Sequence, residues 1–493
     1  MIDNIFNFVT RRTKSIEQLL AAREMGHRRM PRTLSALDLT ALGVGAIIGT
    51  GIFVLTGVAA ANYAGPGVVF SFVLAAVASG LAALIYAEMS SAIPVAGSAY
   101  TFSYVSLGEL LAWLVGWNLI LEYLVASGAV AIGWSSYFSD LLRSAGITLP
   151  TRLTTSAIEG GIINLPAALI VLAITGLIIL GTQHSATANK FVVIAKVSAI
   201  ILFIILGVRH INPVNWTPFL PYGVTGIFHG AAIVFFAYIG FDAVSTAAEE
   251  VKNPNRDLTI GIIGSLGIAT VLYLLVSLIL TGMVPYTDLN TASPVAYALL
   301  RAGLPWATAA ISLGALAGLT SVLLVMLYGQ SRIFFAMARD GLLPPIFDWI
   351  HPRLLTPVWD SMIIGVLVSI IAGLVPIGIV VELTNIGTLA AFTAIAAGLL
   401  VLRRKRPDLP RPFKVPLVPW IPYTSMFASV YLMFNLPTLT WIRFALWIGI
   451  GILVYFSYGY RHSLLVKTNE AQSFLTEVIP RPAWKRKPPE DRK

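Results

Sequence analysis

The chain has 493 residues, of which 57% are hydrophobic and only 11% are charged, and its mean hydropathy is +0.82. Charged residues make up about a quarter of a soluble globular domain, so this composition excludes a soluble protein and indicates an integral membrane protein. The net charge of +10 does not indicate a nucleic-acid partner, because the basic residues gather in the two tails and in one loop at 403–414.

Residues 1–36 are polar and basic, with neither an apolar core nor a small-residue cleavage site. We therefore expect no cleavable signal peptide, and the first membrane helix serves as the insertion signal. Residues 2–22 are consistent with an amphipathic helix on the inner leaflet and equally with a frayed tail.

Apolar runs of about 20 residues, the length that crosses about 30 Å of hydrocarbon, recur along almost the whole chain. We predict twelve membrane helices, at 37–61, 67–93, 100–139, 161–181, 187–208, 224–249, 258–282, 304–337, 358–376, 381–402, 415–434 and 441–460. With twelve helices both tails lie on one side of the membrane, which also holds most of the 33 Lys and Arg residues. The positive-inside rule then places both termini in the cytoplasm and the protein in the inner (plasma) membrane.

The first of these helices contains three glycines, Gly45, Gly49 and Gly51, within seven residues. Each glycine costs about 1 kcal/mol of helix propensity relative to alanine, so we expect this helix to unwind inside the membrane. Broken backbone at that depth persists only where it lines a cavity or is buried in protein. The segment therefore predicts a binding site.

The sixth helix contains a second candidate break, where aromatic residues surround Gly240 and Asp242. Gly240 is alternatively a simple close-packing site between helices. Paired breaks in two halves of a chain are typical of transporters with inverted repeats. We therefore predict a tail at 1–36, repeats at 37–208 and 209–402, two further helices at 403–460, and a second cytoplasmic tail at 461–493.

Several motifs resemble those of the cationic amino-acid transporters of the amino acid-polyamine-organocation superfamily. They lie, in family order, at 37–57, 86–88, 94–100, 108–110, 116–121, 240–242, 249–254 and 336–342. The resemblance implies an all-α LeuT-type fold, with a 5+5 inverted repeat plus two C-terminal helices. Two helices of the animal members are absent, which indicates a bacterial-type member.

The chain also departs from the family pattern. Thr259 stands where a proline is usual, so the start of the seventh helix is set less rigidly. Glu122 replaces an uncharged residue of the animal members. The presence of Lys196 on the fifth helix resembles the pattern of the proton-coupled bacterial relatives.

An amino acid presents a carboxylate and an ammonium, and a membrane site must satisfy both without water. Free N–H groups at the first break suit the carboxylate, because they lie at the positive end of the following half-helix. The expected donors are those of Gly49, Thr50 and Gly51. Carbonyls released at both breaks suit the ammonium, and we expect those of Ile47, Phe236, Ala237 and Ile239 to accept from it.

Selectivity for the substrate side chain requires other residues, and charges inside a membrane are the first candidates. Glu122 is expected to bind a cationic side chain directly or through water, or else to be a structural carboxylate. Asp242 either faces the substrate side chain or caps the lower half-helix. Met326 is the expected pocket floor, or else packs in the core, and a long apolar floor favours small neutral substrates.

Lys196 is the candidate for proton coupling. An ammonium between the first, fifth and eighth helices imitates the cation of sodium-coupled members, and burial allows such a lysine to lose and regain its proton. We therefore expect a proton, not sodium, as the coupling ion. The alternative is a permanently charged lysine that ties helix-one carbonyls to the fifth helix.

Phe236 is the expected gate over the substrate, and the alternative is packing against Tyr238 or Phe241. The sequence thus predicts a secondary active, proton-coupled importer of small neutral L-amino acids, with cationic ones as a further class. The alternatives are a facilitator or exchanger of cationic amino acids and a sensor that does not transport. We expect no enzymatic activity, no metal or other cofactor, contact with membrane lipid, and function as a monomer.

Overall fold

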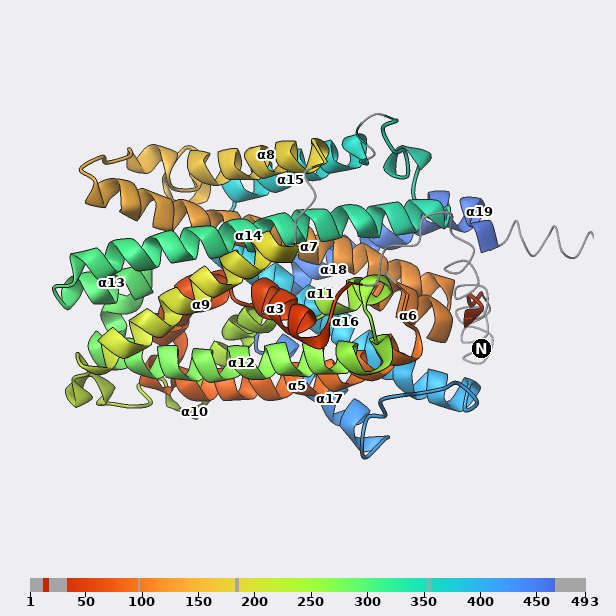
Figure 1. Ribbon diagram of the computed structural model, residues 1–493, viewed down its shortest axis with the longest axis horizontal. Coiled ribbons are helices and arrows are strands. Elements are labelled where there is room, and N and C mark those ends of the chain that lie inside the picture. Colours follow the sequence, from red (N-terminus) through yellow and green to blue (C-terminus); the bar gives the residue numbers. More distant parts are fainter. Residues whose placement is uncertain are drawn as a thin grey trace, which may run out of the picture.

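The computed structural model describes residues 12–16, 33–95, 98–181, 186–352, 354 and 356–465. Within these residues the fold is all-helical, apart from one isolated parallel bridge between Leu34 and Val251. Long helices run side by side along the longest axis of the molecule (Figure 1). The expected amphipathic helix at 2–22 falls largely outside the described residues, and the tail at 461–493 falls almost wholly outside them.

The first part of the chain contains a broken helix followed by several long ones. The broken helix consists of α3 (Ala36–Ile47), a π-helical turn at Gly51–Leu55, α4 (Thr56–Ala59) and a second π-helical turn at Ala60–Ala64. After it come α5 (Val68–Ala92), α6 (Ser98–Ser106), α7 (Glu109–Ser144), α8 (Leu165–Ile179) and α9 (Ala186–Val208).

The second part begins with another broken helix, α10 (Gly223–Val234), a 3-10 turn at Phe235–Tyr238 and α11 (Ala243–Thr246). The helices that follow are α12 (Pro254–Met283), α13 (Pro294–Arg301), α14 (Pro305–Arg339), α15 (Val358–Leu374), α16 (Ile377–Lys405), α17 (Trp420–Phe434), α18 (Thr438–Val454) and α19 (Tyr460–His462).

Eight helical segments among the described residues are long and apolar enough to cross a membrane, and three shorter apolar helices accompany them. Every one of the twelve predicted spans overlaps one of these helices or α17. The count of twelve crossings and the inverted repeat stay predictions. One boundary differs, because the span expected at 100–139 is divided into α6 and α7 at Gly108, whose φ of +103° favours glycine and interrupts the helix.

The two longest helices, α7 and α14, pack against each other through the middle of the molecule (Figure 1). On one side they meet α8 and α15, and on the other α12 lies alongside both α3 and α5. The broken helices are thus enclosed by α7, α14 and α12, and they hold their irregular backbone away from lipid, as membrane depth requires.

The two described ends of the chain meet at one end of the bundle, around the buried carboxylate of Glu109. Arg12 Nη1 lies 3.3 Å from Glu109 Oε1, and the hydroxyls of Tyr455 and Ser463 donate to the same carboxylate at 2.9 and 2.5 Å. Lys14 makes a neighbouring ion pair, 2.5 Å from Asp340 at the end of α14. Both tails therefore start from the same face of the molecule.

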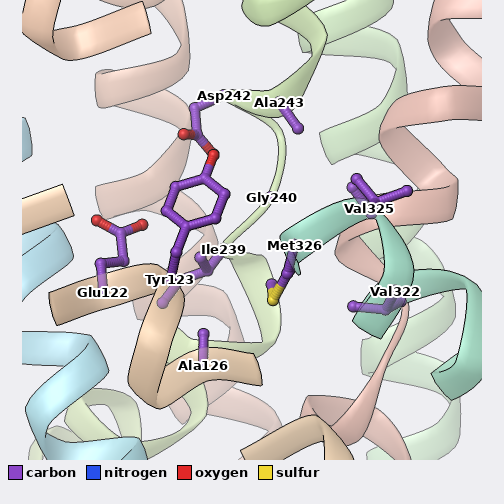
Figure 2. A pocket seen from close by; sticks show the side chains of 11 residues that line it. Glu122, Tyr123, Ala126, Ile239, Gly240, Asp242, Ala243, Val322, Val325 and Met326 are labelled. Carbon is purple, nitrogen blue, oxygen red and sulfur yellow. The ribbon is translucent and has the colours of Figure 1, made fainter. Parts of the chain in front are cut away.

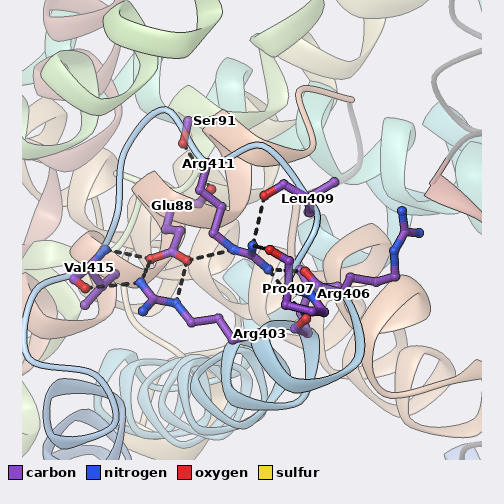
Figure 3. Close-up of polar contacts among 9 residues, drawn as sticks. Glu88, Ser91, Arg403, Arg406, Pro407, Leu409, Arg411 and Val415 are labelled. Carbon is purple, nitrogen blue, oxygen red and sulfur yellow. Dashed lines mark hydrogen bonds and ion pairs between the residues drawn. The ribbon is translucent and has the colours of Figure 1, made fainter.

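Glu88 is a buried carboxylate that pairs with two arginines, away from the cavity described below (Figure 3). Arg403 donates to its two oxygens at 2.8 and 2.5 Å, Arg411 lies 3.4 Å away, and the N–H of Val415 donates at 2.6 Å. Two guanidinium groups and a backbone donor thus compensate the desolvation of this carboxylate. Glu88 ties α5 to the end of α16 and to the basic loop that follows it.

Candidate functional site

The first break lies where the glycines predict it. Helix α3 ends at Ile47, Ile48 is extended with φ −75° and ψ 102°, and a π-helical turn begins at Gly51. A Cβ on Gly51 would overlap the backbone of Ala237 in the second broken helix. Gly51 is therefore required by the close approach of the two chains, whereas Gly49 meets only Val322 at an ordinary 3.5 Å.

The second break is longer. After α10 the chain continues as a 3-10 turn, Ile239 is extended with φ −66° and ψ 140°, and Gly240 has φ +114°. A Cβ on Gly240 would lie 2.9 Å from the carbonyl carbon and oxygen of Ala46. The two breaks therefore lie against each other, so that backbone groups from both share one region of the membrane core.

Buried side chains already hold some of the released carbonyls. The hydroxyl of Tyr273, on α12, lies 3.0 Å from the Ile47 oxygen and 2.8 Å from the Ala237 oxygen. The ammonium of Lys196, on α9, donates to the oxygen of Gly45 and, at 3.0 Å, to that of Ile48. Tyr273 thus bridges the two breaks, and fully buried Lys196 anchors the first.

A small cavity lies beside the breaks, with a volume of about 20 Å³. Its wall is formed by Ala46, Glu122, Tyr123, Ala126, Ile239, Gly240, Asp242, Ala243, Val322, Val325 and Met326. A single water molecule needs about 10–15 Å³ by the same measure, so the cavity in this conformation holds about one water and no amino acid.

Two carboxylates dominate the polar side of this cavity. The Tyr123 hydroxyl is hydrogen-bonded to Asp242, and Figure 2 shows its ring between the two carboxylates. Glu122 is hydrogen-bonded to Thr388 of α16, and its Oε2 has no partner among the described residues. No lysine or arginine in the described part of the chain forms an ion pair with either acid.

The opposite wall is apolar. Val322, Val325 and Met326 come from one face of α14, and Figure 2 shows Met326 and Val322 across from Tyr123. The cavity therefore combines broken backbone, two acidic groups and a hydrophobic wall. Such an arrangement recognises a small molecule that has hydrogen-bond donors at one end and apolar atoms at the other.

Four of the predicted site residues line the cavity: Glu122, Ile239, Asp242 and Met326. The other predicted residues lie outside its wall, and these are Ile47, Gly49, Thr50, Gly51, Lys196, Phe236 and Ala237.

The positions of two of these outer residues bear on their expected roles. The Thr50 hydroxyl is 3.4 Å from the Ala129 oxygen of α7 and is completely buried. The rings expected as alternative partners of Phe236 are engaged elsewhere, Tyr238 with Phe72 and Phe241 with Tyr86. The roles of Thr50 as donor and Phe236 as gate stay predictions.

Apart from Gly240, which the sequence marked as the second break, the remaining wall residues were not singled out. Val322 and Val325 precede Met326 at helical spacing, so they share its face and were within reach of a pattern argument. Tyr123 follows Glu122 directly, and nothing in the sequence distinguishes it from a tyrosine that faces lipid. No group of three His, Cys, Asp or Glu residues that could hold a metal comes together in the described residues.

Comparison with known proteins places the chain in a family. Residues 34–456 match the family model described as amino acid permease. The chain is 49% identical to the methylthioribose transporter of Bacillus subtilis, over 92% of this chain and 99% of that relative. It is also 49% identical to the branched-chain amino acid permease BcaP of the same organism, over 92% and 98% of the two chains. Human cationic amino acid transporter 4 is 32% identical, over 88% of each chain.

Proposed function

Because this chain belongs to the amino acid permease family, we propose that it imports small neutral L-amino acids together with protons, by alternating access. Family membership makes it a transporter and not an enzyme, and it agrees with the resemblance to cationic amino-acid transporters. The proposal further places both tails in the cytoplasm, the chain in the inner membrane in contact with lipid, and the active unit as a monomer.

The observation that carries the proposal is the cavity beside two facing breaks. N–H groups around Gly49 and Gly51 are suited to the substrate carboxylate, and carbonyls such as that of Ile239 are suited to the ammonium. These groups recognise the part that all amino acids share. Selection among amino acids then falls to the side chains of the cavity wall.

The wall supports small or branched apolar side chains. Val322, Val325 and Met326 present hydrocarbon and a thioether to the cavity, and a long side chain has no room beyond them. One of the relatives is named as a branched-chain amino acid permease. We therefore rank alanine, valine and leucine above arginine and lysine as substrates.

Cationic amino acids form a second candidate class, because Glu122 and Asp242 face the cavity without a cationic partner among the described residues. A substrate ammonium or guanidinium would supply that partner. The same two acids also suit the hydroxyl donors of methylthioribose, the compound for which one relative is named.

Alternating access is supported by the small size of the cavity. With room for about one water, it must widen before an amino acid enters. At one end of the bundle Glu88, Glu109 and Asp340 form ion pairs with their cations. At the other end the Tyr137 hydroxyl donates to the Phe53 oxygen at 2.7 Å. Movement of the broken helices relative to α7 and α14 would open one end at a time.

Proton coupling is assigned to Lys196. It is fully buried, and its ammonium binds two carbonyls of the first broken helix. Loss of its proton would remove the positive charge, weaken both hydrogen bonds to these carbonyls and loosen that helix, so protonation and helix position would be linked. A bound sodium ion is not part of the proposal.

Uptake into proteoliposomes tests the proposal. We expect radiolabelled alanine to accumulate when the outside is more acidic, and competition by the twenty amino acids and methylthioribose to rank the substrates. Uptake without dependence on the pH gradient would favour the facilitator or exchanger, and binding without counterflow would favour the sensor. Competition by methylthioribose alone would reject an amino-acid substrate.

Substitution of Lys196 tests the coupling role separately. We expect Lys196→Met to keep alanine binding and counterflow while losing accumulation driven by the pH gradient. Lys405→Met, which removes an exposed lysine at the end of α16, is the matched control and should retain accumulation. Full pH-driven accumulation by Lys196→Met would disprove the assignment.

A further inference from the structure

The second break begins several residues before Gly240, the residue that the sequence marks as the point of interruption. Helix α10 ends at Val234, well before Gly240. The residues around its end, Ala232, Ile233 and Phe235, are all compatible with a continued α-helix. Neither glycine nor proline stands there, so another part of the molecule must determine where α10 gives way to the 3-10 turn.

The change of helix type itself leaves a carbonyl unused. In an α-helix each N–H bonds to the carbonyl four residues earlier, and in a 3-10 helix to the carbonyl three residues earlier. Where one type passes into the other, one carbonyl at the junction therefore lacks an N–H donor. At this junction the Phe235 N–H donates to the Ala231 and Ile233 oxygens, so the carbonyl left without a donor is that of Ala232.

Asn385, from the middle of α16, supplies the missing donor. Its Nδ2 lies 2.7 Å from the Ala232 oxygen and 3.1 Å from the Ile233 oxygen, and its side chain is completely buried. The orientation of the amide is determined by these bonds, because the reverse would place its oxygen against two carbonyls. Its Oδ1 has no partner among the described residues.

Helix α16 is itself held against α7, the helix that carries Glu122 and Tyr123. Asn118 of α7 donates to the Gly387 oxygen at 2.5 Å, and a Cβ on Gly387 would lie 3.0 Å from Asn118 Oδ1. One turn after Asn385, Thr388 is hydrogen-bonded to Glu122. Helix α16 therefore contacts both parts of the site. Asn385 binds the end of α10, and Thr388 binds the cavity carboxylate of Glu122.

We propose that Asn385 is a positioning residue for the substrate, which fixes the end of α10 and thereby the backbone that follows it. That backbone includes Ile239 and Gly240, which line the cavity, and the carbonyl of Ile239 assigned to the ammonium. The inference rests on the proposed function, and it deepens that function by naming the residue that determines where the second break starts.

Because the break recognises the group common to all amino acids, loss of Asn385 affects every substrate alike. We expect Asn385→Ala and Asn385→Asp to raise the KM for alanine, leucine and lysine by the same factor, about tenfold, as for the loss of one buried hydrogen bond. The maximal rate should change far less. Asn385→Gln keeps the donor and should restore part of the affinity.

Two further variants separate this role from a structural one. Thr388→Val removes the partner of Glu122 and should change the ratio of KM values between lysine and alanine instead of raising all equally. Asn215→Ala removes an amide that donates to the Gly282 oxygen at 2.8 Å, outside the site, and should leave every KM unchanged. The unfolding temperature of each purified variant is measured in parallel.

Unchanged KM values in Asn385→Ala with a lowered unfolding temperature would reduce Asn385 to a structural residue and overturn the inference. A change confined to one substrate would also overturn it. If Asn385→Ala does not fold, the comparison of Asn385→Gln with wild type decides, since the longer arm should raise all three KM values together. If the wild type takes up none of the three amino acids, the proposed function fails and the inference fails with it.

Discussion

Buried side chains from three different helices hold the carbonyl groups that the two breaks release. Lys196, Tyr273 and Asn385 bind two carbonyls each. A carbonyl oxygen has two lone pairs, so those of Ile47 and Ala237 can still accept from a substrate ammonium beside the Tyr273 hydroxyl. The carbonyl oxygens of the two breaks are thus held in position before a substrate binds. The side chains that hold them lie outside the cavity wall.

Tyr273→Phe tests this dependence. Removing the hydroxyl leaves two buried carbonyls with one donor fewer, which costs about 1 kcal/mol in positioning. We expect the KM for alanine to rise several-fold, measured by uptake into proteoliposomes. Tyr238→Phe is the matched control, since its hydroxyl donates instead to the Phe72 oxygen at 3.0 Å and its ring packs edge-on against Tyr273. An equal effect of both variants would argue against a special role for Tyr273.

Glu122→Gln tests the selectivity of the acidic wall. The substitution keeps the shape of the side chain and removes the charge that would attract a cationic substrate. We expect competition by lysine against alanine uptake to weaken about tenfold or more, while the KM for alanine changes little. Glu382→Gln removes a carboxylate of α16 that lies outside the cavity wall and accepts from Thr440 at 2.5 Å, and it serves as control. Undiminished competition by lysine in Glu122→Gln would contradict the assignment.

At the scale of the helix, two glycines determine how closely the broken segments approach. Gly51 faces the Ala237 backbone and Gly240 faces the Ala46 carbonyl. Each break therefore contains a glycine whose missing side chain lets the backbone of the other break come close. Gly240 in addition has φ +114°, a conformation that other residues rarely adopt. These two positions couple the geometry of one helix to that of the other.

Gly240→Ala should therefore abolish most transport. The positive φ costs an alanine about 1–3 kcal/mol, and its Cβ would meet Ala46 at 2.9 Å, so the breaks must separate. We expect the uptake rate for alanine to fall at least tenfold at equal protein amount. Gly267→Ala, within α12, meets nothing within 4 Å and should preserve uptake. Preserved uptake in Gly240→Ala would show that the breaks need not touch.

Local sequence patterns were sufficient to predict the breaks but not their partners. The glycine spacing at Gly45, Gly49 and Gly51 predicts the end of α3 near Ile47, because propensity acts within one segment. The end of α10 at Val234 follows instead from Asn385, a residue distant in sequence. The same limit explains why Glu122, Asp242 and Met326 were recognised at the cavity by their chemistry, whereas Tyr123 and Tyr273 required three-dimensional packing.

For the whole molecule, the N-terminal segment contacts both α14 and the broken helices, which move relative to each other in the proposed mechanism. Lys14 pairs with Asp340 at the end of α14. Leu34, just before α3, pairs with the backbone that follows α11, donating to the Glu250 oxygen at 3.0 Å and accepting from Lys252 at 2.9 Å. The start of the first broken helix and the backbone after the second are therefore linked, and the N-terminal segment is attached at both sides of the end that opens in the proposed mechanism.

Lys14→Ala should make that end open more readily. The chain contains no cysteine, so Ala243→Cys in the cavity wall provides a unique thiol. We expect a membrane-impermeant thiol reagent, applied to inside-out vesicles, to modify this cysteine several-fold faster when Lys14→Ala is also present. Arg406→Ala, which removes the partner of the exposed Asp408, is the control. An unchanged modification rate would show that the N-terminal segment does not restrain opening.

The cavity of about 20 Å³ also makes transport sensitive to water activity. Opening to admit an amino acid fills the widened space with solvent, and a solute too large to enter, such as sucrose, draws that solvent out and favours the closed form. Uptake should therefore slow as osmolality is raised equally on both sides of a vesicle, at a constant pH gradient, and a small solute that penetrates the cavity should slow it less. A cell that loses water would then take up its nutrients more slowly through this protein, without any signal other than the dehydration itself.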